Sequence, residues 1–373
     1  MALPVRIRRL LPAAALALTA VLAAAGCTRA VGATSATSTT STGSAAPPAL
    51  TTAQAQQAFH RYVTTTATAA KTNDGPLALS VVTGPQRSVV AAAIKSAGYA
   101  HRAVSLDRYV YGKPTFYLPE AGGYPRFFAA SAPRDFPGTD PGDMYATWAG
   151  SAEAPLSGTA LLLFEQAGAG ASWQLASTTV LAFGAAMPPL AADGDGAIPT
   201  VPLSATTSGA TALLAKPDVA GPLQAAVVDD GPASAASAAV AAGPLTTGMY
   251  RGARNHEQGL TPPAGDVYQW DLEGAGYPSF TFKTADGGAL VFYAMCLESV
   301  VATPSDISKA DPVKPGPRIT YPADLDPWIG AGHYRDSVQR QDLLTFAAID
   351  PPAGAGKIHV IAVGGGLNFA AAT

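Results

Sequence analysis

The sequence predicts an α+β protein with two tandem domains, each made of helices followed by a curved antiparallel sheet. Apolar residues at helical spacing come first in each half of the chain. Aromatic and β-branched runs with alternating spacing come second, and short turn sequences recur in the same order in both halves. Helices and antiparallel strands that are segregated along the chain are typical of α+β folds.

The first half begins with helical sequence. Thr51 and Gln54 have the three-residue spacing of a capping box. The apolar stripe that follows, at spacings of three and four residues, consists of Ala55, Phe59, Tyr62 and Val63. These features predict a helix that ends near Lys71. Two more helices are predicted over 77–82 and 84–98.

Strand-like spacing begins after Arg102 in the first half. Strands are predicted over 104–111, 116–118 and 124–129. Residues 131–158 are rich in Pro, Gly and Asp and predict a loop that contains one strand near 144–148. The half closes with a predicted hairpin whose strands are 159–166 and 172–181.

The second half repeats this plan. The predicted domains are 51–187 and 218–373, and the proline-rich segment 188–217 between them is predicted to be a linker. Helices are expected over 218–228 and 232–242, and helix or coil up to Glu257. The expected strands are 267–272, 278–283, 288–297 and a hairpin of 343–349 with 357–363. The larger size of this half is attributed to an insertion over 301–332.

Three pairs of turn sequences support an internal duplication. They are Gly84-Pro85 with Gly243-Pro244, Gly123-Tyr124-Pro125 with Gly276-Tyr277-Pro278, and Ala167-Gly168-Ala169-Gly170 with Ala353-Gly354-Ala355-Gly356. Each pair alone is weak evidence in a chain with 38 Gly and 32 Pro, but the shared order is informative. The alternative is two unlike α+β domains whose turns coincide by chance.

The N-terminus has the layout of a secretory signal. Three arginines precede an apolar run, and small residues lead to Cys27. The sequence Ala24-Ala25-Gly26-Cys27 resembles the lipobox of bacterial lipoproteins, which implies that residues 1–26 are removed and that the sulfur of Cys27 receives a diacylglycerol. The alternative is an ordinary secretory signal with an incidental cysteine. The Ser/Thr-rich segment 27–50 is then a flexible tether, with or without O-linked sugars.

At the scale of the whole chain, the sequence resembles uncharacterised lipoproteins of actinobacteria, a family without an assigned function. The matching stretches are 123–128, 161–164 with Trp173, 243–248 and 284–292. In element order, each half also resembles the NTF2-like and cystatin-like folds, in which a curved sheet cradles a long N-terminal helix. These resemblances imply a fold and a location, but no activity.

Charge and motifs narrow the function classes. The net charge is −3, and it becomes −6 when the arginine-bearing residues 1–26 are removed, which argues against nucleic acid as a partner. None of the five histidines is spaced i, i+4 from another, and no Gly-x-Ser-x-Gly elbow occurs. The run Gly354-Ala355-Gly356-Lys357 lacks the first glycine and the Ser/Thr of a phosphate loop. We therefore expect no catalytic motif, cofactor site or metal site.

Aromatic residues give the remaining site hypothesis. An apolar pocket between helix and sheet is expected to be lined by Tyr124, Phe127, Phe128 and Trp173 in the first half, or by Tyr277, Phe280, Phe282 and Tyr293 in the second. The alternative is that these side chains fill two cores.

Three functions follow from the sequence. The main hypothesis is a membrane-anchored extracytoplasmic lipoprotein at the cell envelope, non-enzymatic, that binds an unknown ligand or protein. The second is an envelope hydrolase or isomerase that uses a pocket carboxylate such as Asp143 or Asp286. The third is a structural or assembly module.

Overall fold

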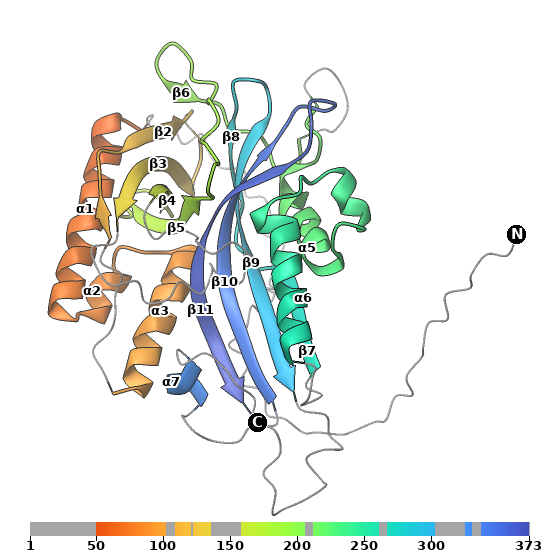
Figure 1. Cartoon of the computed structure of the whole chain (residues 1–373). Helices are drawn as coiled ribbons and strands as arrows, with labels where there is room; N and C mark the ends of the chain where they lie inside the picture. The colour runs from red at the N-terminus through yellow and green to blue at the C-terminus, as the bar shows by residue number, and fades with distance from the viewer. Residues whose placement is uncertain are drawn as a thin grey trace, which may run out of the picture.

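A computed structural model describes residues 50–101, 109–120, 122–135, 158–205, 212–260, 267–302, 325–329 and 337–372. It confirms the α+β class, with helices before strands in both halves (Figure 1). The signal segment, Cys27, Asp143, the strand predicted near 144–148 and most of the insertion at 301–332 lie outside these residues. Within them, no helix combines the length and the apolar character needed to cross a membrane.

The helices of the first half are α1 (Thr52–Thr72), α2 (Gly75–Leu79) and α3 (Gly84–Tyr99). The predicted capping box is present at α1. The Gln54 N–H donates to Thr51 Oγ1 at 3.3 Å, and the Thr51 N–H donates to Gln54 Oε1 at 3.0 Å. Phe59 and Tyr62 are buried on the predicted apolar stripe.

The first six strands are β1 (Val110–Tyr111), β2 (Thr115–Pro119), β3 (Arg126–Asp135), β4 (Gly158–Gln166), β5 (Gln174–Leu181) and β6 (Ala197–Ile198). The predicted hairpin is confirmed as β4 and β5, which pair antiparallel. The segment predicted as a linker contains β6, which pairs parallel with β2, and it also bridges to the second half between Leu190 and Thr284. This segment is therefore packed on both halves.

The second half begins with short helices: η1 (Pro217–Val219), α5 (Ala220–Asp230), η2 (Ala235–Ala238), η3 (Pro244–Gly248) and α6 (Met249–Leu260). Its strands and last helix are β7 (Val267–Gly274), β8 (Phe280–Lys283), β9 (Ala289–Ala302), α7 (Asp326–Ile329), β10 (Ser337–Asp350) and β11 (His359–Ala372). The second predicted hairpin is confirmed as β10 and β11, which are longer than expected.

The strands of both halves join in one 11-stranded sheet. Its order is β6-β2-β3-β4-β5-β11-β10-β9-β7, with β1 on β3 and β8 on β9. The last strand of the first half pairs antiparallel with the last strand of the second, through Val180 with Val363 and Leu181 with Ala362. Each half therefore contributes one side of a shared sheet, and the division into domains at 187 and 218 stays a prediction.

A repeated local structure supports the duplication. In the first half, the Thr83 N–H donates to Leu175 O, and the Leu175 N–H donates to Val81 O. In the second half, Ala241 donates to Ile358 O and Ile358 donates to Ala239 O in the same pattern. Each bridge joins the residues just before a Gly-Pro helix start to the beginning of the last strand.

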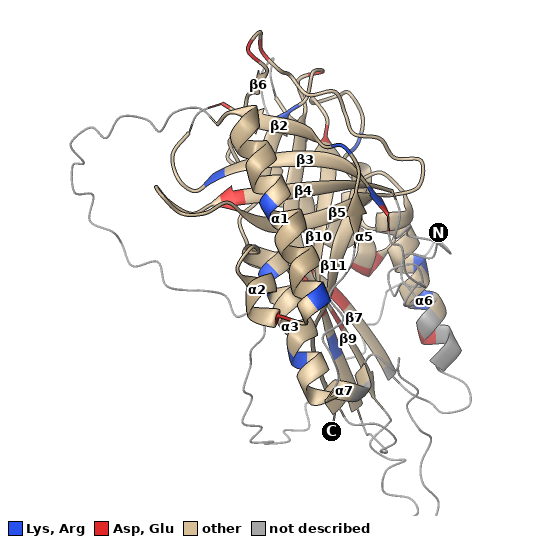
Figure 2. Ribbon diagram, turned by 90° about the vertical axis from the view of Figure 1, so that its left-hand side faces the viewer, with Lys and Arg blue, Asp and Glu red and all other residues tan. Residues whose placement is uncertain are grey.

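The sheet bends where the halves meet, so that parts of it pack face to face. Phe127 of β3 lies 4.9 Å from Phe280 and 5.4 Å from Phe282 of β8, between ring centroids. Helices α1 and α2 cover the outer face of the first half, and α5 and α6 cover the outer face of the second, as Figures 1 and 2 show. The result is a helix–sheet–sheet–helix arrangement with an aromatic core between the halves.

Candidate functional site

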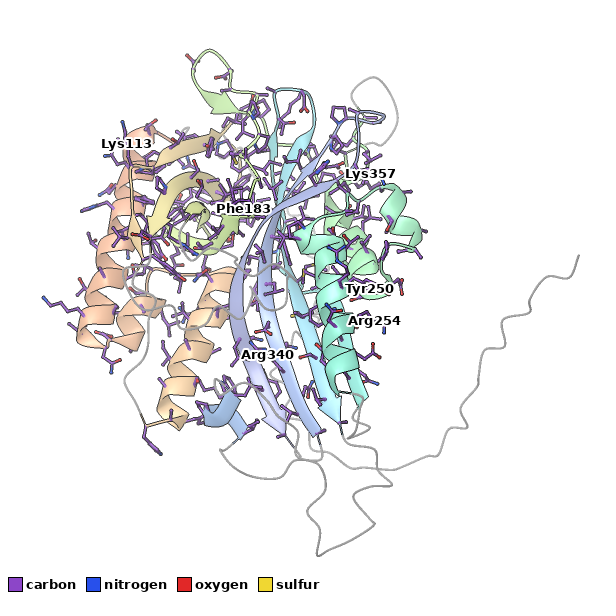
Figure 3. All side chains as sticks on the ribbon, viewed as in Figure 1. Lys113, Phe183, Tyr250, Arg254, Arg340 and Lys357 are labelled. Carbon is purple, nitrogen blue, oxygen red and sulfur yellow. The ribbon has the colours of Figure 1, made fainter. Side chains whose placement is uncertain are left out.

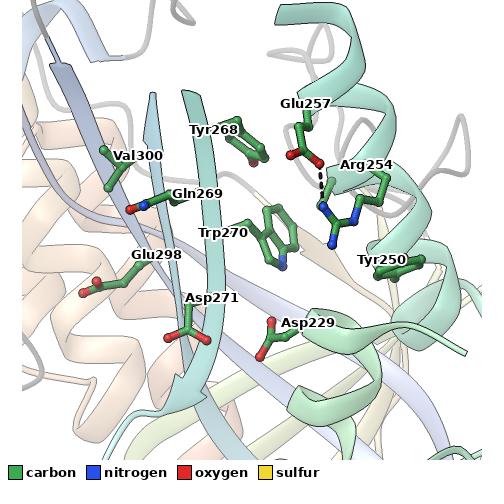
Figure 4. Close-up of a pocket in the computed structure, with 11 residues that line it drawn as sticks. Asp229, Tyr250, Arg254, Glu257, Tyr268, Gln269, Trp270, Asp271, Glu298 and Val300 are labelled. Atoms are coloured by element: carbon green, nitrogen blue, oxygen red, sulfur yellow. Dashed lines mark hydrogen bonds and ion pairs between the residues drawn. The ribbon is translucent and has the colours of Figure 1, made fainter. Parts of the chain in front are cut away.

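A groove of about 480 Å³ lies between helix α6 and the edge strand β7. Figure 4 shows the residues that line it: Asp229, Tyr250, Ala253, Arg254, Glu257, Tyr268, Gln269, Trp270, Asp271, Glu298 and Val300. Ligand pockets commonly have volumes of about 300–1,000 Å³, aromatic walls and a few polar groups. The groove has this size and this mixture of side chains.

The alternation of strand β7 divides its side chains between two sides. Tyr268 and Trp270 point toward α6, whereas Gln269 and Asp271 point away from it (Figure 4). Asp271 pairs in register with Glu298 of β9, which brings two carboxylates to one face of the sheet. The groove therefore extends around the edge of the sheet.

Asp229, near the end of α5, closes one end of the groove. Its Oδ1 accepts the N–H of Leu272 at 3.1 Å. Burial, followed by the charge of Asp271, raises the pKa of Asp229 to about 7, while the Leu272 N–H acts in the opposite direction. A proton on Asp229 therefore relieves the repulsion between its carboxyl group and that of Asp271.

Helix α6 supplies the opposite wall. Arg254 Nη1 lies 2.6 Å from Glu257 Oε2, and its guanidinium lies 5.4 Å from the centre of the Tyr250 ring. Both partners of the ion pair are exposed, at 51% and 39% of their side-chain surface, so the pair contributes little to stability. The ion pair does show that this wall of the groove accommodates a guanidinium between the Tyr250 ring and the Glu257 carboxylate.

Buried polar side chains support the sheet beside the groove. Arg340 Nε and Nη2 donate to the two carboxylate oxygens of Asp342 at 2.6 and 2.8 Å. Gln341 Nε2 donates to Glu298 Oε1 at 2.7 Å and so fixes one groove carboxylate. Figure 3 shows Arg340 on the strands, with Tyr250 and Arg254 on α6.

Comparison with known proteins gives one match. A family model described as a domain of unknown function, DUF8094, matches residues 46–367. The chain belongs to the DUF8094 family. No curated protein and no solved structure matches it, so the likeness to NTF2-like and cystatin-like folds stays a prediction. The DUF8094 match covers all of the groove.

The four aromatic residues expected to line a pocket in the first half of this DUF8094 chain lie in different places. Phe128 is fully buried and stacks on Phe164 at 4.7 Å, with Trp173 edge-on at 5.0 Å. Phe127 lies on the opposite face, in the core between the halves. Tyr124 is 40% exposed. The structure does not bring these four side chains together around one space.

The four aromatic residues expected in the second half are also divided. Phe282 is fully buried, and Tyr277 and Ser88 share a hydrogen bond of 2.8 Å between their hydroxyl oxygens. The buried Tyr293 donates to Gln224 Oε1 at 2.8 Å. Phe280 and Tyr293 border a narrow gap beside Glu165, whose pKa is raised by burial. These positions agree with the alternative in which the aromatics fill cores, although the two halves share one of those cores.

Asp286 does not have the environment expected of a pocket acid. Thr284 Oγ1 and the Gly288 N–H donate to Asp286 Oδ1, and these bonds lower the pKa of its carboxyl group. Asp286 is an exposed residue of the β8–β9 turn. The hypothesis that Asp286 is the pocket carboxylate of a hydrolase or isomerase is therefore wrong. The structure shows instead a carboxylate that stabilises a turn and has a lowered pKa.

No sequence motif marks the groove residues, because they come from α5, α6, β7 and β9. The available signal was the polar pattern in the predicted strand at 267–272, where Gln269 and Asp271 alternate with aromatics. Within the described residues, no three His, Cys, Asp or Glu side chains are grouped so that they could hold a metal ion.

Asp350 gives a pH prediction outside the groove. It is fully buried, its Oδ1 accepts the Ala215 N–H at 3.3 Å, and its Oδ2 has no hydrogen-bond partner in the described part of the chain. Burial raises the pKa of Asp350 to about 7. The folded state thus holds this proton more tightly than the unfolded state, so its contribution is complete below pH ~4 and is lost as pH rises to about 7.

We expect Asp350→Asn to match the wild-type protein near pH 4 and to exceed its stability at pH 8 by on the order of 3 kcal/mol. Urea unfolding at several pH values measures this difference. Asp195→Asn, at an exposed turn position, is the control and should follow the wild-type curve. If the stabilities of wild type and Asp350→Asn depended on pH in the same way, folding would not raise the pKa of Asp350, which would contradict this prediction.

Proposed function

We propose that this DUF8094 protein is a lipid-anchored extracytoplasmic binding protein whose ligand site is the groove between α6 and β7. The groove is the observation that carries the proposal. It combines aromatic walls, open access and polar groups fixed by the fold, such as Glu298 on Gln341 and Asp229 on Leu272. A binding role needs these features and no catalytic motif.

The anchor rests on the sequence before the fold. Described structure begins at Leu50, next to the capped start of α1. The preceding segment from Cys27 is rich in Ser and Thr, and its r.m.s. span is roughly 26 Å for a flexible chain of this length. Such a tether would hold the domain just beyond the lipid headgroups. Two or more acyl chains on Cys27 would give stable membrane binding.

Cys27→Ser tests the anchor. We expect the wild-type protein to partition into Triton X-114 detergent and the variant to stay in the aqueous phase. Cys296 is disulfide-bonded in the structure, and the sequence has two cysteines. Because one sulfur cannot carry both a thioether and a disulfide, a disulfide that includes Cys27 would exclude a lipid on Cys27. The intact mass before and after reduction distinguishes these two states. A Cys27 released as a thiol by reduction, with no added lipid mass, would overturn the anchor.

Native mass spectrometry of the detergent-solubilised protein from its own host tests the binding role. We expect a stoichiometric small molecule that is retained in Asp195→Arg and lost in Asp271→Arg, which places a long cationic side chain in the groove. Thermal unfolding of both variants checks that they are folded. A clean apo mass, or a molecule retained equally by both variants, would contradict a ligand site in the groove.

One observation favours an envelope hydrolase or isomerase as a second candidate. Asp229 and Asp271 both line an open groove, and the pKa of about 7 at Asp229 suits a general acid or base. A panel of 4-methylumbelliferyl esters and glycosides tests it. Turnover that depends on pH near 7 and is abolished in Asp229→Asn would favour this candidate over a binding protein.

A further inference from the structure

We propose that the groove between α6 and β7 binds an organic cation, an aliphatic ammonium or guanidinium group held between aromatic rings and carboxylates. This inference rests on the proposed function, because it names the ligand class of the same groove. Three features of the groove carry it: the sign of its charge, its aromatic walls and its size.

The sign of the charge selects a cation. Four carboxyl side chains line the groove, Asp229, Glu257, Asp271 and Glu298, against the single guanidinium of Arg254. Even with Asp229 protonated, the lining carries an excess of two negative charges. An anionic ligand would meet this field unfavourably, whereas a cation would be attracted and held.

The aromatic walls of the groove also favour a cation, because a cation is attracted to the face of an aromatic ring. Tyr250 on α6 and Trp270 on β7 line opposite sides of the groove, as Figure 4 shows. Cations above such rings gain about 0.5–2 kcal/mol. Arg254 already lies 5.4 Å from the Tyr250 ring and 2.6 Å from Glu257, so the chain's own guanidinium occupies part of the same environment. A ligand cation would share this wall or displace Arg254 from it.

The size of the groove favours a molecule over a bare ion. A volume of about 480 Å³ is far larger than a metal ion needs, and no described group of three acidic, His or Cys side chains could coordinate one. Gln341 Nε2 also donates to Glu298 Oε1 at 2.7 Å, which fixes the position of this carboxylate. A chain-like cation with methylene groups would cover Val300 and Ala253, both of which line the groove.

Binding of a cation should be linked to a proton. Asp229 faces Asp271 and the Leu272 N–H on β7, Asp230 lies beside it on α5, and Tyr250 and Arg254 face the same groove from α6. An ammonium group beside Asp229 would favour the ionised form of its carboxyl group and so displace its proton. We therefore expect affinity to rise as pH increases from 6 to 8, with proton release on binding.

Three probes of equal carbon chain length separate the ligand classes: cadaverine, 1,5-pentanediol and glutarate, which end in ammonium, hydroxyl and carboxylate groups. Isothermal titration of the solubilised protein should show cadaverine binding at least about tenfold more tightly than either other probe, which corresponds to about 1.4 kcal/mol. Equal affinities, tighter binding of pentanediol or glutarate, or binding of none of the three would overturn the cation.

Variants locate the effect. Asp271→Asn combined with Glu298→Gln should weaken cadaverine binding at least about tenfold, since two carboxylates are neutralised without a change of shape. The matched control, Asp195→Asn combined with Glu120→Gln, neutralises two exposed carboxylates outside the groove and should leave cadaverine binding unchanged. Arg254→Gln should tighten cadaverine binding, because the guanidinium that competes with cadaverine for the groove is removed. Equal weakening in both neutralised variants would mean that cadaverine senses only net charge, which overturns the site.

The inference and the proposed function fail separately. A neutral or anionic molecule that co-purifies with the wild-type protein and is lost in Asp271→Arg would leave the groove as a ligand site and remove only the cation. A protein with no co-purifying molecule and no response to any probe would remove both.

Discussion

Arg340→Met is expected to destabilise the protein by about 3–5 kcal/mol, because it leaves the carboxylate of Asp342 buried without its partner. The two side chains are 4% and 5% exposed, and two hydrogen bonds join them. Removing one member of a buried pair is costly because the remaining charge keeps its desolvation penalty. Chemical denaturation at pH 7 measures the loss.

The double variant Arg340→Met with Asp342→Leu is the matched control. Replacing both members by apolar side chains of similar size removes the stranded charge, so most of the lost stability should return. Double-mutant analysis of the four proteins gives the coupling directly. A single variant that loses less than about 1 kcal/mol, or a double variant that is as unstable as the single one, would contradict a desolvated pair at this position.

Local structure could largely be predicted from the sequence. The capping box at Thr51, the apolar stripe of α1 and the two hairpins β4–β5 and β10–β11 follow from signals within about 25 residues of one another. The joining of both halves into one sheet could not be predicted in this way. It depends on pairs such as Val180 with Val363, which are far apart along the chain.

The aromatic residues show the same limit. The sequence places Phe127, Phe280 and Phe282 in a pocket lining or in a core, but the spacing within one strand does not say which core a side chain enters. Because the sheet bends, Phe127 of the first half packs on the two phenylalanines of the second. The candidate groove escaped prediction for a related reason, since its charged residues lie on four elements and only the fold brings them together.

Gly364→Ala is expected to cost about 3 kcal/mol or more, because the junction between the halves leaves no room for a side chain. A Cβ on Gly364 would lie 1.9 Å from Thr178 O and 2.9 Å from Thr178 C, which are backbone atoms that cannot rotate away. Thr345 Oγ1 also donates to this same Thr178 carbonyl at 3.2 Å. Any shift that relieves the clash must therefore disturb β5, β10 and β11 together.

Gly274→Ala is the matched control, since Gly274 ends the edge strand β7 and an added Cβ would meet no atom within 4 Å. Thermal and urea unfolding should place this variant within about 0.5 kcal/mol of the wild-type protein. The comparison isolates the steric effect, because both substitutions restrict the unfolded chain equally. If Gly364→Ala were as stable as Gly274→Ala, β11 could not lie against β5 at Thr178, and the two halves would have to be joined by other contacts.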